Sequence, residues 1–164
     1  MPTIAEMQRK GWGNPDASDY VADHVTSITV ADRTFRVRKE VAPLFHAFVL
    51  LLERGGVDIS KGTLDDWGYA NRDIRGYPGS KSMHAWGLAI DVDALKNVLG
   101  SPKTSFPKIA TRRAAEDCSL DWGYLWDDRP DPMHFEFTGS RSQIPAALAR
   151  LRKRHPLVYR KVMR

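Results

Sequence analysis

The residues best suited to chemistry lie in two short segments. The first is residues 82–91, which read SMHAWGLAID, and the second is residues 131–137, which read DPMHFEF. Together they supply two imidazoles, His84 and His134, and a carboxylate, Asp91. These are nitrogen and oxygen ligands of the kind that zinc accepts.

Three protein ligands with a fourth position left for water are typical of a catalytic zinc site, whereas structural zinc sites are closed and usually rich in cysteine. The chain has one cysteine, Cys118, so a cysteine-based structural site is excluded. Asp131 precedes His134 by three residues, and Pro132 favours an extended backbone there. A carboxylate so placed could take a proton from a metal-bound water, whose pKa falls towards ~7, and pass it to a leaving amine. The chemistry indicated is peptide-bond hydrolysis.

The elements that position these side chains are two predicted strands. Apolar and polar residues alternate in both 87–93 and 133–138, which predicts half-buried strands with Asp91 and His134 on their polar faces. His84 lies just before the first strand. If the two strands pair, we expect the three side chains to converge in one cleft.

Both motifs resemble the zinc D-alanyl-D-alanine carboxypeptidase family, which includes VanY-type carboxypeptidases and phage L-alanyl-D-glutamate endopeptidases. The pattern Ser-x-His-x-x-Gly-x-Ala-x-Asp spans residues 82–91, and acid-x-x-His-Phe-Glu spans residues 131–136. The two motifs in this order are far more specific than either alone. The resemblance implies an α+β fold with a central, mainly antiparallel sheet and helices packed on one face.

Carried over residue by residue, the resemblance makes His84, Asp91 and His134 the ligands of a Zn²⁺ cofactor and Asp131 the general base. Many family members have Glu at the position of Asp131. Aspartate is associated with the phage endopeptidase branch, so both carboxypeptidase and endopeptidase activity remain open.

An arginine-containing segment precedes the first motif. Residues 67–76, WGYANRDIRG, are similar to the corresponding segment of phage-encoded members, in which one arginine is expected to hold a substrate carboxylate. Arg72 and Arg75 are both candidates, because an arginine fork can bind a carboxylate through two hydrogen bonds. The alternative for each is a surface ion pair with a neighbouring aspartate.

Three further residues are candidates for the site. Ser82 can hydrogen-bond near His84 or serve only as a turn residue. Trp126 belongs to an aromatic segment that borders the cleft in the family, or else it is a core residue. Glu136 shares a strand face with His134 and can accept the second N–H of that imidazole, unless it is simply an exposed strand charge.

The length of 164 residues predicts a single zinc peptidase domain, 1–164. Residues 1–24 show little periodicity and are predicted to form an irregular N-terminal arm. Alternation over 27–37 predicts a β-hairpin, and apolar spacing over 41–54 predicts a helix that backs the sheet. Residues 141–164 are predicted to form a basic, helical C-terminal tail.

Charge is unevenly distributed. The chain carries a net charge of +5, but residues 141–164 hold eight Lys/Arg and no Asp or Glu, which leaves the remainder at −3. The tail is thus either a solvated helix face or a surface for an anionic polymer such as a wall polymer, phospholipid or nucleic acid. Nucleic acid is the less favoured partner, because no nucleic-acid-binding motif is present.

No apolar run reaches the ~18–20 residues of a transmembrane helix, and the first residues do not form a Sec-type signal peptide. We therefore expect synthesis in the cytoplasm and action at the bacterial cell wall. The leading hypothesis is a phage endolysin that hydrolyses the stem peptide of peptidoglycan. The alternatives are a non-catalytic zinc-binding module and a basic protein that binds nucleic acid or cell wall.

Overall fold

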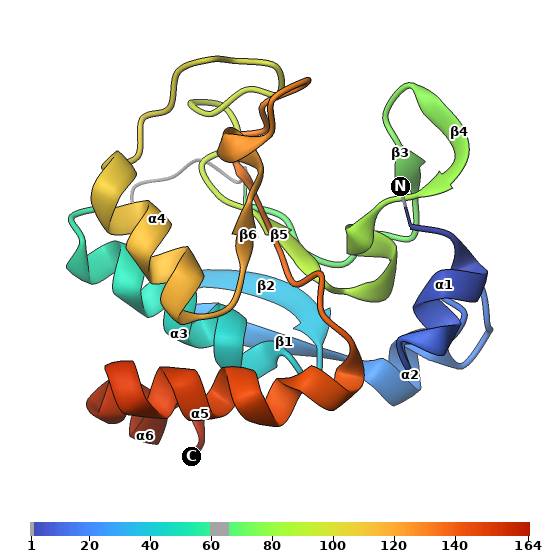
Figure 1. Ribbon diagram of the computed structural model, residues 1–164, viewed down its shortest axis with the longest axis horizontal. Coiled ribbons are helices and arrows are strands. Elements are labelled where there is room, and N and C mark those ends of the chain that lie inside the picture. Colours follow the sequence, from blue (N-terminus) through green and yellow to red (C-terminus); the bar gives the residue numbers. More distant parts are fainter. Residues whose placement is uncertain (1, 60–65) are drawn as a thin grey trace.

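The computed structural model describes residues 2–59 and 66–164 (Figure 1). The α-helices are α1 (Ile4–Arg9), α2 (Tyr20–His24), α3 (Ala42–Arg54), α4 (Lys108–Asp117), α5 (Ile144–Arg154) and α6 (Pro156–Val162). The strands are β1 (Val25–Val30), β2 (Arg33–Arg38), β3 (Asp73–Ile74), β4 (Tyr77–Lys81), β5 (Ala89–Asp91), β6 (Asp121–Trp122) and β7 (His134–Glu136). Short 3₁₀ helices are η2 (Met83–Trp86), η3 (Gly123–Leu125) and η4 (Arg141–Gln143).

This mixture of helices and small antiparallel sheets confirms the predicted α+β class. Within the described residues, no helix combines the length and apolar character needed to cross a bilayer.

Several small sheets stand where one central sheet was expected. β1 pairs with β2, β3 pairs with β4, and a three-stranded sheet has the order β5-β7-β6, all antiparallel. An extended segment links two of them: the Tyr69 N–H donates to the Arg36 carbonyl of β2 at 2.6 Å, and Trp67 forms a β-bridge with Asp91 of β5. The hairpin β1-β2 and the three-stranded sheet are therefore held side by side through backbone hydrogen bonds.

The predicted hairpin and its backing helix are both present. β1 and β2 pair from Val25 with Arg38 to Val30 with Arg33, and Ala31 and Asp32 between them have positive φ, as tight hairpin turns require.

Helix α3 is the centre of the helical layer. Most of its apolar residues are buried, and Phe48 contacts Phe135 of β7 with ring centroids 4.4 Å apart. Helix α3 also packs on β1 and β2, while α4, α5 and α6 pack against α3 (Figure 1). The predicted basic tail is helical, and its residues Leu151 and Val158 are buried, so one face of the tail is part of the hydrophobic core.

The prediction of an irregular N-terminal arm over residues 1–24 was wrong. This segment contains α1 and α2, and it buries Met7, Trp12 and Tyr20 in the core. The Arg38 guanidinium, itself buried, donates hydrogen bonds to the Trp12 carbonyl and the Tyr20 hydroxyl. These helices of six and five residues span fewer than two turns, too few for apolar spacing to repeat, which is why the sequence pattern did not reveal them.

Gly87 fixes the approach of η2 to β2. It follows η2 in a left-handed conformation, with φ of 68°. The Arg38 N–H donates to the Gly87 carbonyl at 2.8 Å, and a Cβ at Gly87 would lie 2.7 Å from the Arg38 nitrogen. Only glycine combines this φ with so close a contact, so Gly87 positions the short helix that carries His84.

We predict that Gly87→Ala lowers the free energy of unfolding by about 2–4 kcal/mol, because it adds backbone strain and a steric clash. Gly56→Ala is the matched control: Gly56 also has a positive φ, of 93°, but a Cβ there meets nothing within 4 Å. The control should lose only about 1–2 kcal/mol. Denaturant unfolding measures both, and equal losses would contradict the role given to the Arg38 contact.

Candidate metal centre

His84 is held on η2 and is buried. The Ser82 hydroxyl caps this helix by accepting a hydrogen bond from the His84 N–H at 3.4 Å. The ring Nδ1 of His84 lies 2.7 Å from the Gly68 carbonyl, which can only accept, so Nδ1 carries the proton. Nε2 is therefore the nitrogen with a free lone pair.

Asp91 and His134 face each other as paired residues of β5 and β7. His134 Nε2 lies 2.9 Å from the Glu136 carboxylate and donates to it, which leaves Nδ1 with the lone pair. The Glu136 side chain is only 14% exposed and thus not a free strand charge. Asp91 is buried rather than half-buried, because the segment at Trp67 covers the outer edge of β5.

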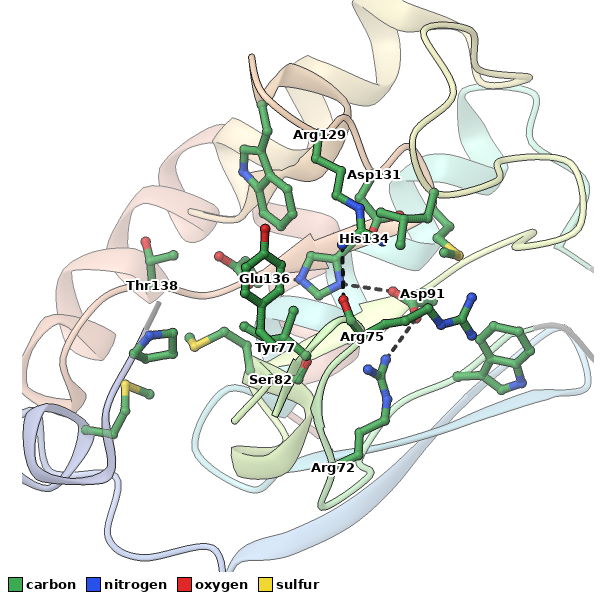
Figure 2. A pocket seen from close by; sticks show the side chains of 18 of the residues that line it. Arg72, Arg75, Tyr77, Ser82, Asp91, Arg129, Asp131, His134, Glu136 and Thr138 are labelled. Atoms are coloured by element: carbon green, nitrogen blue, oxygen red, sulfur yellow. Dashed lines mark hydrogen bonds and ion pairs between the residues drawn. The ribbon is translucent and has the colours of Figure 1, made fainter. Parts of the chain in front are cut away.

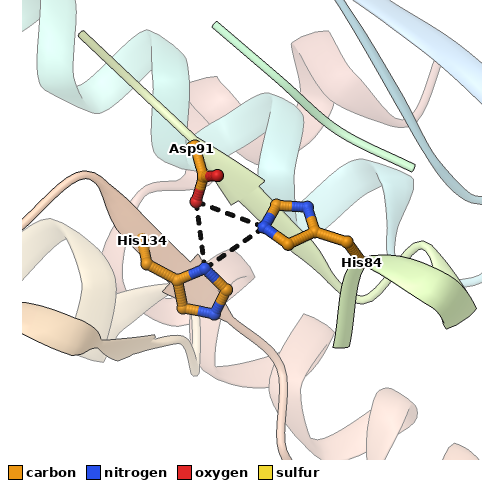
Figure 3. A group of neighbouring side chains, drawn as sticks. All are labelled: His84, Asp91 and His134. Carbon is orange, nitrogen blue, oxygen red and sulfur yellow. Dashed lines mark hydrogen bonds and ion pairs between the residues drawn. The ribbon is translucent and has the colours of Figure 1, made fainter. Parts of the chain in front are cut away.

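The three side chains meet in a compact triangle (Figure 3). Asp91 Oδ1 lies 3.2 Å from His84 Nε2 and 3.0 Å from His134 Nδ1, and the two nitrogens are 3.3 Å apart. Zinc bonds to nitrogen and oxygen of ~2.0–2.1 Å at tetrahedral angles would separate neighbouring ligands by roughly 3.3–3.4 Å. The triangle is therefore close to the size of one face of a zinc tetrahedron.

The electrostatics of the triangle favour a bound cation. Burial raises the pKa of Asp91, but the charges and hydrogen bonds of His84 and His134 outweigh this and hold it well below its usual range. Burial lowers the pKa of His134, and its hydrogen bonds to Asp91 and Glu136 overcome this and raise it to about 10. Without a metal ion, the negative charges of Asp91 and Glu136 keep a proton on the His134 imidazole, and a bound metal ion replaces that proton. The donor set thus fits a divalent cation.

Asp131 lies beside the triangle with an incomplete set of partners. Its backbone is fixed, since its N–H donates to the Gly123 carbonyl and its carbonyl accepts from the His134 N–H. Its side-chain Oδ1 is buried without a hydrogen-bond partner among the described residues. Burial raises the pKa of Asp131 to about 6, with a smaller upward contribution from the charge of Asp91. A half-buried carboxylate with one unpartnered oxygen is suited to accepting a proton near neutral pH.

The centre opens into a cleft of about 600 Å³ (Figure 2). The structure brings the sequence-predicted residues Arg72, Arg75, Ser82 and Trp126 to its walls. The Arg72 guanidinium lies 4.0 Å from the Asp91 carboxylate. Trp126 is 39% exposed, so it is not a core residue, and its ring centroid lies 5.3 Å from that of His134.

Sequence reasoning missed other residues of the cleft. Arg129 lines it and donates to the Arg75 carbonyl at 3.1 Å, so a third arginine joins the two predicted ones. The sequence feature that could have identified Arg129 as a cleft residue is its position two residues before Asp131. Helix α1 also contributes to the wall, and no sequence pattern indicated that.

We predict that Asp131→Asn stabilises the chelator-treated protein by about 1–2 kcal/mol at pH 8, after allowance for partial exposure. The pKa of Asp131 is about 6 in the folded protein, against an ordinary value of 3.8. Between pH 3.8 and about 6 the folded protein therefore binds more protons than the unfolded chain. Wild-type stability should therefore fall as pH rises from about 4 to 6, and the variant avoids this loss.

Denaturant unfolding at pH 5 and pH 8 measures the effect, which should be smaller at pH 5. The exposed Asp128 provides the control, because Asp128→Asn should give no such difference. Equal stability of Asp131→Asn and the wild type at pH 8 would contradict burial of an unpaired charge.

The comparisons with known proteins agree with this geometry over part of the chain. The family model described as D-alanyl-D-alanine carboxypeptidase matches residues 75–137, which is less than half of the sequence but includes all three residues of the triangle and Asp131. No curated protein and no solved structure matches the chain. The similarity to D-alanyl-D-alanine carboxypeptidases thus holds for residues 75–137, and it does not distinguish VanY-type enzymes from phage endopeptidases.

Proposed function

We propose that the protein is a zinc-dependent peptidase that hydrolyses the stem peptide of bacterial peptidoglycan. The observation that carries the proposal is the triangle of His84 Nε2, Asp91 Oδ1 and His134 Nδ1, with Asp131 beside it in an open cleft. This triangle lies within the segment similar to D-alanyl-D-alanine carboxypeptidases.

The three atoms of the triangle would hold Zn²⁺. The donations of His84 to Gly68 and of His134 to Glu136 fix both ring tautomers, so the nitrogens that face the ion are unprotonated. When bound, the ion lowers the pKa of a coordinated water and polarises the carbonyl of the scissile bond.

Asp131 serves as the general base in this proposal. Its unpartnered Oδ1 is free to accept the proton of the attacking water and then to protonate the leaving amine. A pKa of about 6 leaves it largely ionised at neutral pH yet able to hold the proton between the two transfers. This retained, half-buried base also argues against a non-catalytic zinc-binding module.

The arginines of the cleft would bind the carboxylate of the substrate. Arg72, Arg75 and Arg129 line the same cleft, and the donation of Arg129 to the Arg75 carbonyl ties two of them together. Guanidinium groups bind carboxylates with paired hydrogen bonds, so a peptide with a free carboxylate is a suitable ligand. Trp126 forms the wall near His134.

Two finer assignments complete the proposal. The bond cleaved is either the terminal D-Ala–D-Ala bond or the L-Ala–D-Glu bond, and Asp131 in place of glutamate favours the second. The protein would act at the cell wall as a phage endolysin, and the basic face of α5 and α6 would approach an anionic wall polymer.

The direct test is mass spectrometry of purified stem peptides after incubation with the protein, with and without a zinc chelator. We expect cleavage that the chelator abolishes and that added zinc restores. Loss of a terminal D-Ala would define a carboxypeptidase, and separation of L-Ala from D-Glu would define an endopeptidase. Intact peptides in the presence of bound zinc would contradict the proposal.

Three variants distinguish metal binding from proton transfer within the site. We predict that His84→Ala loses both zinc and activity, because it removes one of three ligands. Asp131→Ala should retain about one zinc per chain and lose about 10²–10⁴-fold in kcat. His46→Ala is the control: this half-buried histidine on α3 lies outside the triangle, so the variant should keep both.

Zinc content by atomic emission and initial rates on stem peptides give the two readouts. Full activity in Asp131→Ala would exclude the proposed base, and unchanged zinc content in His84→Ala would exclude the proposed ligand set.

A further inference from the structure

The cleft continues past the metal centre to the N-terminal helix. Its far wall is formed by Pro2, Glu6, Met7 and Lys10, at or next to α1, together with Thr138. The four N-terminal residues lie outside the segment that resembles known carboxypeptidases, so this wall is a separate feature of the present chain.

The metal centre lies between this wall and the arginines. Figure 2 shows Thr138 and Arg72 on opposite sides of His134. Thr138 follows His134 by four residues along and just beyond β7, and an extended chain advances ~3.3 Å per residue, which gives about 13 Å. The cleft between the centre and α1 is thus long enough for about four extended peptide residues.

Helix α1 is fastened to this end of the cleft. The Lys10 ammonium donates to the Thr138 carbonyl at 3.2 Å, and the Arg141 N–H donates to the Lys10 carbonyl at 2.8 Å. Just beyond the helix, the indole N–H of the buried Trp12 donates to the Gly139 carbonyl at 2.9 Å. These contacts tie α1 to the chain that leaves β7, so the wall is a fixed part of the fold.

The charge at this wall is balanced. Glu6 and Lys10 form an ion pair of 3.1 Å, and their side chains are 40% and 35% exposed. Met7 and Met83 add apolar surface nearby. The two charged side chains of this wall that line the cleft, Glu6 and Lys10, therefore cancel, in contrast to the three arginines that line the cleft beyond the metal centre.

We propose that α1 forms the subsite for the part of the peptide substrate on the amino side of the scissile bond. Because Glu6 and Lys10 neutralise each other, this subsite does not discriminate between positive, neutral and negative substrate ends. The inference rests on the proposed function: if the arginines take a carboxylate on the carboxyl side of the scissile bond, the opposite end receives the amino side. Glu6 and Lys10 are thereby specificity-determining residues, and their removal leaves the metal centre untouched.

The test uses one peptide in three charge states. The peptide carries four residues before the bond that the wild type cleaves: it is L-Ala-D-Glu-L-Lys-D-Ala-D-Ala if D-Ala is released, and the same peptide with three glycines added before L-Ala if L-Ala–D-Glu is cut. Its amino end is left free, acetylated or succinylated, so that this end is positive, neutral or negative. Glu6→Gln leaves Lys10 unpaired and should raise the kcat/KM ratio of succinylated to free peptide about three- to fivefold over the wild type. Lys10→Met leaves Glu6 unpaired and should lower that ratio by a similar factor.

The matched controls are Glu116→Gln and Arg112→Met, which break an exposed (i, i+4) ion pair of 2.8 Å on α4, away from the cleft. Neither should change the ratio. If the α1 ion pair has only a structural role, the kcat/KM ratio of succinylated to free peptide should change in the same direction in both α1 variants, or not at all. That result would overturn the inference and leave the peptidase function intact. Failure of the wild type to cleave any of the three peptides would instead overturn the proposed function, and the inference with it.

Discussion

The convergence of three electron-pair donors on one buried point is the constraint on which the rest of the site depends. His84 Nε2, Asp91 Oδ1 and His134 Nδ1 lie 3.0–3.3 Å apart, and each imidazole gives its remaining N–H to an oxygen acceptor. Such an arrangement needs a positive charge among the three donors, because they are shielded from water. A proton on His134, whose pKa is raised to about 10, supplies that charge in the absence of metal, and a bound cation takes its place. A site of this kind is organised for a metal ion before the ion arrives.

The scaffold achieves this by uniting segments that are far apart in sequence. Antiparallel pairing of β5 with β7 sets Asp91 opposite His134, and the contact of Gly87 with β2 sets η2 and its histidine. Packing of Phe48 of α3 on Phe135 holds β7 from behind. The helices therefore cover one side of the sheets, and the opposite side remains available for a cleft with arginines at one end and α1 at the other.

The features of the site that follow from local sequence patterns were predicted, whereas those that depend on tertiary contacts were not. The spacing of the two motifs anticipated β5, β7 and the convergence of His84 with Asp91, because strand periodicity fixes which side chains share a face. The helix α1 and the burial of Trp12 were not predicted, since they depend on contacts with residues more than a hundred positions away. Arg129 was missed because its place in the cleft also follows from a tertiary contact, its hydrogen bond to the Arg75 carbonyl 54 positions away.

Anomalous diffraction from a zinc-soaked crystal, recorded on both sides of the zinc absorption edge, tests the central claim most directly. The account predicts one strong peak about 2.0–2.2 Å from each of His84 Nε2, Asp91 Oδ1 and His134 Nδ1, with Asp131 near the ion but outside its ligand set. A peak elsewhere on the molecule, or none within bonding distance of these three atoms, would contradict it.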